Sequence, residues 1–488
     1  MKISILLFCL FSSALQAQIT IDWENSYGDG QGNDHQRTTD GGTVIVGESF
    51  VSGSGINVKI IKLNSSGALE WEQIYGGSNH ESGQSVLQTA DGGYIVASAS
   101  ESSDGDVTGN HGDYDFWLLR LDASGSLLWE KSFGGSGEDY AHEIIPANDG
   151  GFLIAGHTFS NNGDVTANNG MGDFWVIKIN DGGNLLWQKN YGGSDDDLAT
   201  GIAATPDGYI IAGQSSSSNG DVSQNNGEAD VWTVKINNSG VLQWEKSTGG
   251  SLNDFGNAII VTADGGFAVA GGSNSNDGDI SGNHGEVDYL VLKFDSTGTL
   301  QWQKSLGGSA DEISQNLAQT ADGGFIVCGS SRSSDGDVSV YYGTYTAWLI
   351  KLNPEGDLSW EKSFGSTVVD FSFAYSVEEL LANQFIVAGL RNGMWTMVFH
   401  YGALGTETTI SKNIALFPNP TNGNFTIELG KEKLDVTVEI SNVQGQNISA
   451  DKYKLVKSIN QKINTAAGIY FVKITTHEGS FTFKVVKD

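Results

Sequence analysis

Acidic and amide side chains recur at a fixed spacing in four loop segments of this sequence. In the first segment, positions 1, 3, 7 and 12 of twelve residues are held by Asp104, Asp106, Asn110 and Asp115. The same offsets are held by Asn162, Asp164, Asn168 and Asp173, by Asn219, Asp221, Asn225 and Asp230, and by Asp277, Asp279, Asn283 and Asp288. Oxygen ligands at close to this spacing surround calcium in protein loops. The four segments are therefore candidate calcium-binding loops.

The segments also differ from a calcium loop. Glycine stands at position 2, and the glycine expected at position 6 is present only as Gly109 and Gly282. Position 12 is Asp, which is shorter than the usual Glu. A fifth segment begins with Asp335 but has Tyr341 and Thr346 at the last two positions. Because Asp-Gly and Asn-Gly also form polar Asx turns, the loops are either cation sites or turns, and both interpretations stay open here.

Seven tryptophans divide most of the chain into repeated units. They are Trp23, Trp71, Trp129, Trp187, Trp244, Trp302 and Trp360, and they are separated by 48, 58, 58, 57, 58 and 58 residues. An Asp-Gly-Gly turn before an apolar run recurs as well, as in Asp149–Gly156. Periods of this length are typical of repeat architectures.

One unit contains four segments with the composition of short strands. They are Trp129–Phe133, His142–Ala147, Phe152–His157 and Phe174–Asn180. Each is rich in Val, Ile, Phe or Trp and is bounded by turn-forming Gly, Asn or Asp. Helical periodicity is weak throughout, with Phe373–Leu381 as the best case. Four strands in each of seven units of about 58 residues predict an all-β fold, a seven-bladed β-propeller over residues 18–405.

The two ends of this region predict how the ring closes. The Trp23 strand has no partner before it, and residues 394–401 have no Trp strand after them. Because exposed sheet edges are a liability, we expect these two segments to pair in one sheet.

The turn that carries each tryptophan resembles the tryptophan-docking motif of the pyrroloquinoline-quinone propeller repeats. The resemblance covers about nine residues per unit and rests on the spacing between glycine and tryptophan, as in Gly125 and Trp129. It implies that each tryptophan packs between neighbouring blades. It does not extend to a quinone site, since the vicinal cysteines or metal cluster of those enzymes are missing from the sequence.

The first residues have the composition of a secretory signal peptide. Lys2 supplies the positive start, Ile3–Leu15 is mostly apolar, and we expect cleavage after Ala17, so that residues 1–17 form the signal. The apolar stretch is shorter than the ~20 residues that a membrane span needs. No transmembrane segment is therefore expected.

The charge of the chain bounds its partners. The formal net charge is −32, and residues 414–488 carry nine Lys against seven Asp or Glu, so the negative charge belongs to the repeat region. A negative field of this size repels nucleic acid, which is excluded as a partner. It favours solubility outside the cell and attracts cations.

The sequence contains no recognisable catalytic motif. HExxH, nucleophile-elbow and phosphate-loop patterns are absent, and Cys328 lies in an apolar strand that predicts a buried, inert side chain. Among eight histidines, only His111 and His284 occupy equivalent positions of the repeat. The stretches that depart most from the repeat are Val340–Thr346 and Ser366–Ala374.

Two classes of function remain. The first is a binding scaffold without chemistry of its own, whose propeller face holds an extracellular glycan, peptide or protein. The second is a hydrolase or lyase that acts on extracellular polysaccharide. Acidic side chains that converge in a central pocket would favour the enzyme.

After a linker over residues 406–413, the composition changes. Alternating strands predict a small antiparallel β-sandwich over residues 414–488. The motif residues are Pro418, Asn419, Pro420, Gly423, Gly468, Tyr470, Lys484 and Lys487. This pattern resembles the type A C-terminal sorting domain of type IX secretion. The resemblance implies Sec-dependent export, the type IX secretion machinery as a partner, and delivery to the cell surface or the medium.

Overall fold

The computed structural model describes residues 17–53, 55–365, 371–403, 415–417, 421–442, 446–476 and 479–487. Within these ranges all regular elements are strands, including Phe373–Leu381, which belongs to a strand rather than a helix. The chain divides into two compact units, one over Ile21–His400 and one that contains Tyr401–Asp488. The predicted signal peptide lies outside the described residues apart from Ala17.

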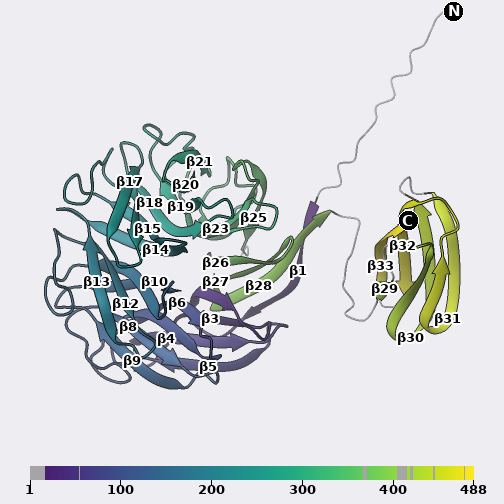
Figure 1. Cartoon of the computed structure of the whole chain (residues 1–488), viewed down its shortest axis with the longest axis horizontal. Helices are drawn as coiled ribbons and strands as arrows, with labels where there is room; N and C mark the ends of the chain where they lie inside the picture. The colour runs from purple at the N-terminus through teal and green to yellow at the C-terminus, as the bar shows by residue number, and fades with distance from the viewer. Residues whose placement is uncertain are drawn as a thin grey trace, which may run out of the picture. The chain divides into compact units, whose positions relative to one another are not determined.

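Seven sheets of four strands follow one another in the first unit (Figure 1). We number them as blades. Blade 1 contains β2 (Gln31–Arg37), β3 (Thr43–Val51), β4 (Gly55–Leu63) and β5 (Leu69–Tyr75); blade 2 contains β6 (Glu81–Gln88), β7 (Tyr94–Ser100), β8 (Asp115–Leu121) and β9 (Leu127–Phe133); blade 3 contains β10 (Asp139–Pro146), β11 (Phe152–Thr158), β12 (Asp173–Ile179) and β13 (Leu185–Tyr191). Blade 4 contains β14 (Asp197–Thr205), β15 (Gly208–Ser215), β16 (Asp230–Asn237) and β17 (Leu242–Thr248); blade 5 contains β18 (Asp254–Val261), β19 (Phe267–Ser273), β20 (Asp288–Phe294) and β21 (Leu300–Leu306). Blade 6 contains β22 (Glu312–Gln319), β23 (Phe325–Ser331), β24 (Thr346–Leu352) and β25 (Leu358–Phe364); blade 7 contains β26 (Ser372–Leu381), β27 (Gln384–Arg391), β28 (Met394–Ala403) and β1 (Ala17–Ser26).

These sheets confirm the predicted all-β, seven-bladed propeller. The grouping of strands differs from the sequence unit by one strand. The Trp129 strand, β9, is the outer strand of blade 2 and does not pair with β10. Each tryptophan strand therefore ends one blade, and the Gly-Gly turn after it leads to the inner strand of the next blade.

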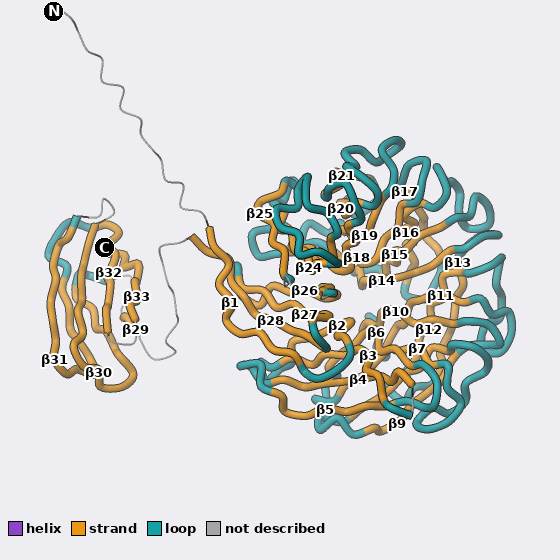
Figure 2. The backbone as a smooth tube through the Cα atoms, turned by 180° about the vertical axis from the view of Figure 1, so that it is seen from behind, coloured by secondary structure: helices purple, strands orange, loops and turns teal. Residues whose placement is uncertain are grey.

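The ring closes as the chain ends predict. β1 joins β28 as the outer strand of blade 7, and the backbone N–H of Tyr27 donates to the carbonyl of Met394 at 2.8 Å. The inner strands β2, β6, β10, β14, β18, β22 and β26 surround the axis, and each contacts the next, including β26 with β2 (Figure 2). Blade 7 therefore combines the first strand of the propeller region with its last three strands.

The repeated tryptophans pack between blades, as the sequence predicts. Trp71 in blade 1 lies against Gly125 in the last turn of blade 2, where an added Cβ would come within 3.0 Å of the indole. The same contact joins Trp23 to Gly67, Trp129 to Gly183, Trp187 to Gly240, Trp244 to Gly298 and Trp302 to Gly356. Since glycine leaves room for the ring, these turns set the spacing of the blades.

A second set of tryptophans lies deeper within the blades. Trp117, Trp175, Trp232, Trp348 and Trp395 stand on the third strands and are fully buried. Their indole N–H groups donate to an outer-strand side chain, as from Trp117 to Glu130 at 2.8 Å. The middle strands, such as β7 and β8, are buried along their whole length because neighbouring blades cover both faces.

The C-terminal unit is built from β29 (Ala415–Phe417), β30 (Asn424–Asn442), β31 (Asn447–Lys462), β32 (Gly468–Thr476) and β33 (Gly479–Lys487). All pairs are antiparallel and form one hydrogen-bonded sheet, which encloses a core with Val438 and Val472. The motif residues Pro418, Asn419 and Pro420 lie outside the described residues. Gly423 takes a φ of 108°, and the Tyr470 hydroxyl donates to the carbonyl of Ala466 at 2.6 Å.

Candidate functional site

The acidic loops join the second and third strands of blades 2 to 6. They lie at the same end of the ring as the Gly-Gly turns between blades, and the two kinds of loop hold each other. Oδ1 of Asp104 accepts from the N–H of Ser78 at 2.8 Å, and Oδ2 of Asp106 accepts from the N–H of Gly76 at 3.1 Å. Positions 1 and 3 therefore bind the turn that precedes their own blade.

Position 7 fastens the loop to itself. Nδ2 of Asn110 donates to the carbonyl of Ser100 at 2.9 Å, and its Oδ1 accepts from the N–H of Gly112 at 2.9 Å. The same side-chain contacts are made by Asn168, Asn225 and Asn283.

Position 12 faces a different place. Asp115 is the first residue of β8, is fully buried, and lies beside Gly134 in the turn that follows its blade. Asp173, Asp230 and Asp288 lie in the same way beside Gly192, Gly249 and Gly307. The four candidate ligands of one loop are thus divided between two joints of the ring. Within the described ranges, no three His, Cys, Asp or Glu side chains form a ready metal-binding group. Calcium in these loops stays a prediction.

The inner strands carry a second set of repeated polar residues. Every inner strand has a β-bulge at the same place, which turns one extra residue out of the ladder. The bulged residues, which we call the polar collar, are Asn33, Gln84, His142, Thr200, Asn257, Gln315 and Tyr375, and all are half-buried. They line the axis because the inner strands surround it.

Part of the collar has a structural role. Nδ2 of Asn33 donates to the carbonyl of Gly83 at 2.9 Å, and Nδ2 of Asn257 donates to that of Ser314 at 2.8 Å. These bonds tie successive inner strands. In the described ranges neither His142 nor Gln315 makes such a bond, so blades 3 and 6 both depart from the pattern.

Two carboxyl groups stand beside the collar. Asp34 Oδ2 accepts from the Val86 N–H at 3.1 Å, and Glu143 Oε2 accepts from the Ile202 N–H at 2.6 Å. Burial, and next the charge of Asp34, raises the pKa of Glu143 to about 8. Burial also raises the pKa of Asp34. Glu143 is therefore largely protonated at neutral pH, and the channel holds less negative charge than its composition suggests.

Five aromatic and imidazole side chains gather at the end of the ring that carries the acidic loops, over blades 2 and 3, and we call this end the mouth. We call these side chains the tyrosine–histidine cluster, and they are His80, Tyr114, Tyr140, His142 and His157. The Tyr114 hydroxyl lies 2.8 Å from Nδ1 of His80, and the Tyr140 ring stacks on His157 with centroids 5.9 Å apart. Two glutamates flank the cluster, with Glu48 3.6 Å from His80 and Glu138 4.0 Å from His157.

The electrostatics of this cluster favour neutral side chains. Burial lowers the pKa of His142 to about 3 and raises that of Tyr114 to about 12. Burial also raises the pKa of Tyr140, while the hydrogen bond from His157 lowers the pKa of Glu138. At neutral pH the cluster therefore offers the uncharged hydroxyls of Tyr114 and Tyr140 and the uncharged imidazole of His142 beside carboxylates.

A second aromatic group lies at the same end of the ring, between blades 6 and 7. Tyr345 packs against Phe373 and Phe371 with centroids 5.0 Å and 6.2 Å apart, and the Arg332 guanidinium lies 5.1 Å from the Tyr345 centroid. We call this group the aromatic platform. It includes part of the eccentric segment Val340–Thr346, whereas residues 366–370 lie outside the described ranges.

Sequence analysis missed the tyrosine–histidine cluster because it looked for histidines that recur. The available signal was the reverse. Blade 3 has Tyr140, His142 and Glu143 where the next inner strand has Leu198, Thr200 and Gly201. A departure from an otherwise even repeat marks this joint.

The ring of seven four-stranded sheets defines the body of the chain as a β-propeller. The C-terminal part has a more specific assignment. Residues 415–488 match the secretion system C-terminal sorting domain. This domain indicates export by type IX secretion, so the protein reaches the cell surface or the extracellular space. The expected export by type IX secretion and the expected location are thereby confirmed.

The body resembles proteins of several kinds at low identity. The regulatory protein FlaEY of Caulobacter vibrioides is 28% identical over 204 residues, which cover 38% of this chain and 21% of FlaEY. The chain thus spans about a fifth of that relative. The WD40 domain of Neurospora crassa Pan2 has 11% identity and a TM-score of 0.46, with 80% of this chain and 96% of that one covered. YCF48 of Cyanidioschyzon merolae has 10% identity and a TM-score of 0.41, covering 77% and 98%.

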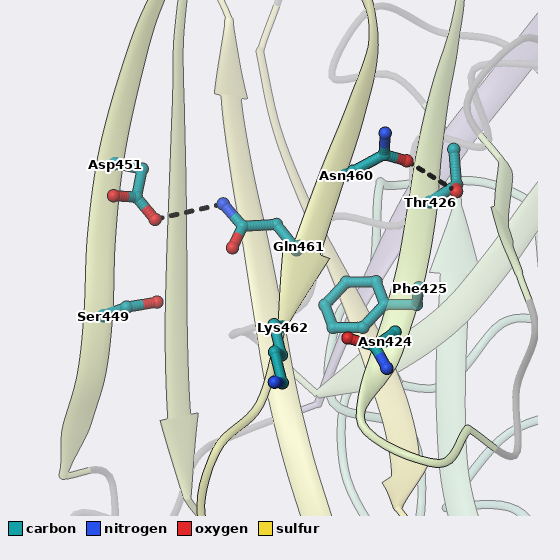
Figure 3. Close-up of a pocket in the computed structure, with 8 residues that line it drawn as sticks. All are labelled: Asn424, Phe425, Thr426, Ser449, Asp451, Asn460, Gln461 and Lys462. Carbon is teal, nitrogen blue, oxygen red and sulfur yellow. Dashed lines mark hydrogen bonds between the residues drawn. The ribbon is translucent and has the colours of Figure 1, made fainter.

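The sorting domain has a polar hollow of about 500 Å³ (Figure 3). Its lining includes Lys462 and two hydrogen-bonded pairs, Gln461 with Asp451 at 3.0 Å and Thr426 with Asn460 at 2.9 Å. A membrane-spanning helix is not found in the part of the chain that the structure describes.

Proposed function

We propose that this exported propeller is an extracellular binding protein that holds a glycan at the mouth of its central channel. The observation that carries the proposal is the mouth itself, where the tyrosine–histidine cluster and the aromatic platform stand on different joints of one even ring. Aromatic faces stack on sugar rings, and neutral hydroxyl, amide and imidazole groups exchange hydrogen bonds with sugar hydroxyls.

The charge at the mouth also supports a glycan. Glu48 and Glu138 are partly exposed there, and the body as a whole is strongly acidic. A neutral or cationic glycan meets less repulsion than a polyanion, so we expect neutral sugars to bind best.

A glycan array and calorimetry with the exported protein test the proposal. The double variant Tyr114→Ala/Tyr140→Ala removes one stacking surface and is expected to weaken binding by about tenfold or more. Leu128→Ala is the matched control, because Leu128 is 57% exposed on the outer strand β9, away from the axis. Equal glycan affinity of the double variant and the control would exclude the mouth as the glycan-binding site.

A second candidate function is acid–base chemistry on a polysaccharide, and one observation favours it. The Tyr140 ring lies 5.1 Å from that of His142, so a phenol and an imidazole stand side by side, as a proton-transferring pair requires. Release of new reducing ends from polysaccharides, lost in His142→Ala, would favour the enzyme over the binding protein.

A further inference from the structure

The joints between blades bring two carboxylates together around a glycine. At the joint of blades 2 and 3, a Cβ on Gly134 would lie 2.5 Å from Oδ1 of Asp115 and 2.6 Å from Oδ2 of Asp139. Since both oxygens lie this close to one point, they are at most about 5 Å apart, a separation at which two carboxylates share one site. Both side chains are fully buried.

One of these oxygens has no partner. Oδ2 of Asp115 accepts from the backbone N–H of His111 at 3.0 Å, but its Oδ1 is buried without a hydrogen bond. Asp139 is partnered at Oδ2 by the N–H of Gly135 at 2.7 Å and the hydroxyl of Ser160 at 2.8 Å. The unpartnered oxygen of Asp115 therefore faces a carboxylate that is already held in place.

The arrangement recurs at three further joints. The pairs are Asp173 with Asp197 around Gly192, Asp230 with Asp254 around Gly249, and Asp288 with Glu312 around Gly307. In each pair the first residue has a buried Oδ1 without a hydrogen bond. No Lys or Arg in the described ranges lies within ion-pair distance of these eight carboxylates.

In the five blades that carry the loop the two members of a pair occur together, whereas at the joint of blades 1 and 2 the inner-strand acid Glu81 faces Asn57. At the joint of blades 6 and 7, both acids are replaced, by Thr346 and Ser372. The acid at loop position 12 is thus present where the next inner strand begins with an acid and absent where it does not. This association explains why the fifth loop has Thr346 at position 12. A cation site formed within each loop alone would not explain this residue.

A third carboxylate adds to each joint from the following loop. Oδ2 of Asp164 accepts from the N–H of Gly134 at 3.3 Å, a long bond, and Asp221 stands in the same relation to Gly192 at 3.3 Å. The joints of Asp173 and Asp230 thus gather oxygen ligands without a cationic partner in the described ranges, whereas Nδ1 of His111 lies 2.7 Å from Asp115 and Nδ1 of His284 lies 2.8 Å from Asp288.

We propose that the four joints each bind a hard divalent cation, calcium, between the paired carboxylates, so that the cations link successive blades. Calcium accepts six to eight oxygen ligands in flexible geometry, and hydroxyls such as that of Ser160 and waters complete the set. The ligands come from two loops, so position 12 of one acidic loop acts with position 3 of the next.

Isothermal titration of the chelator-treated, full-length mature protein with calcium chloride tests the proposal. We expect about four equivalents to bind with dissociation constants of about 0.1–1 mM, as in extracellular calcium modules. The variant Asp115→Asn/Asp173→Asn/Asp230→Asn/Asp288→Asn keeps the shape of the pairs and is expected to bind at least tenfold more weakly. Asp104→Asn/Asp277→Asn/Asp335→Asn is the matched control, because it removes carboxylates from position 1 and leaves the pairs intact.

Three results would overturn the proposal. The first is no calcium binding below several millimolar by the unchanged protein. The second is loss of calcium binding in the position 1 control while the quadruple variant still binds calcium. This result would place the cation in the acidic loops and not at the joints. The third is a melting temperature that rises on acidification from pH 8 to pH 5 but does not change when calcium is added. This result would mean that each pair of carboxyl groups shares a proton and does not bind a cation. Circular dichroism of both variants shows whether the ring is folded.

Discussion

Nε2 of His142 lies 3.3 Å from Nδ1 of His157, so neighbouring strands of blade 3 hold two imidazoles in contact. One ring donates and the other accepts, which requires both to be neutral or only one to be charged. Burial and this neighbour lower the pKa of His142 to about 3, so its neutral form persists well into the acidic range. His142 therefore stays neutral over the pH range of most extracellular environments.

The raised pKa of Glu143 predicts a pH dependence of stability. In the folded protein burial raises the pKa from 4.5 to about 8, so between these values the folded state holds a proton that the unfolded state has lost. The free energy of unfolding therefore falls as pH rises through this window, by at most about 1.4 kcal/mol per pH unit. We expect Glu143→Gln to raise the melting temperature at pH 8.5 relative to its effect at pH 4, as measured by calorimetry.

Glu138→Gln is the control for this prediction, because its sign is opposite. The hydrogen bond from His157 lowers the pKa of Glu138, so this carboxylate stabilises the fold above its unfolded pKa and loses that effect in acid. The substitution is expected to lower stability slightly at neutral pH and to have no effect near pH 3. The same pH dependence of stability in both variants would show that the pKa of Glu143 is not raised in the folded protein.

The closing strand predicts the outcome of a glycine substitution. Gly67 has a φ of 78°, and a Cβ there would lie 2.6 Å from the indole of Trp23 on β1. Gly265 has a φ of 82° and open space around the added atom. Alanine costs about 1 kcal/mol of backbone strain at both, and overlap at Gly67 adds about 1–3 kcal/mol. In urea unfolding, Gly67→Ala is expected to lower the free energy of unfolding much more than Gly265→Ala does. Equal losses of free energy in the two variants would mean that the contact of Trp23 does not stabilise the ring.

The fold was predictable from the sequence because the information is repeated. The seven tryptophans and the apolar runs between them give the same count, and the unpaired ends at Trp23 and residues 394–401 fix the closure. The assignment of strands to blades was off by one, since a repeated sequence has no natural starting point. Only hydrogen bonding shows that the Trp129 strand pairs with β8 and not with β10.

The sites were less predictable for a physical reason. The spacing of Asp104, Asp106 and Asp115 suggests convergence within one loop, but the third strand begins at Asp115 and carries it to the next joint. The partner of Asp115 is Asp139, which is 24 residues later and belongs to another blade. Such pairs arise from the packing of blades, which local spacing does not encode.

Cys328 is predicted to be chemically silent in the folded protein. Its side chain is fully buried on β23, and burial raises the pKa of the thiol well above its ordinary value. Because the thiolate is the reactive form, Ellman's reagent is expected to leave the native protein unmodified and to react with one thiol per chain in guanidinium chloride, provided that Cys9 leaves with the signal. Rapid modification of the native protein would contradict the burial of β23.

Removal of the sorting domain is predicted to separate export from folding. Deletion of residues 414–488 leaves Ile21–His400 intact, and this unit contains the strands of all seven blades apart from the ends of β1 and β28. The truncated protein is expected to fold, to keep its far-ultraviolet circular dichroism and melting temperature, and to remain in the periplasm. Fractionation of the producing cells and surface proteolysis measure its location, with the full-length protein as the positive control. Surface delivery of the truncated chain at the normal level would show that the domain matched at residues 415–488 is not needed for crossing the outer membrane.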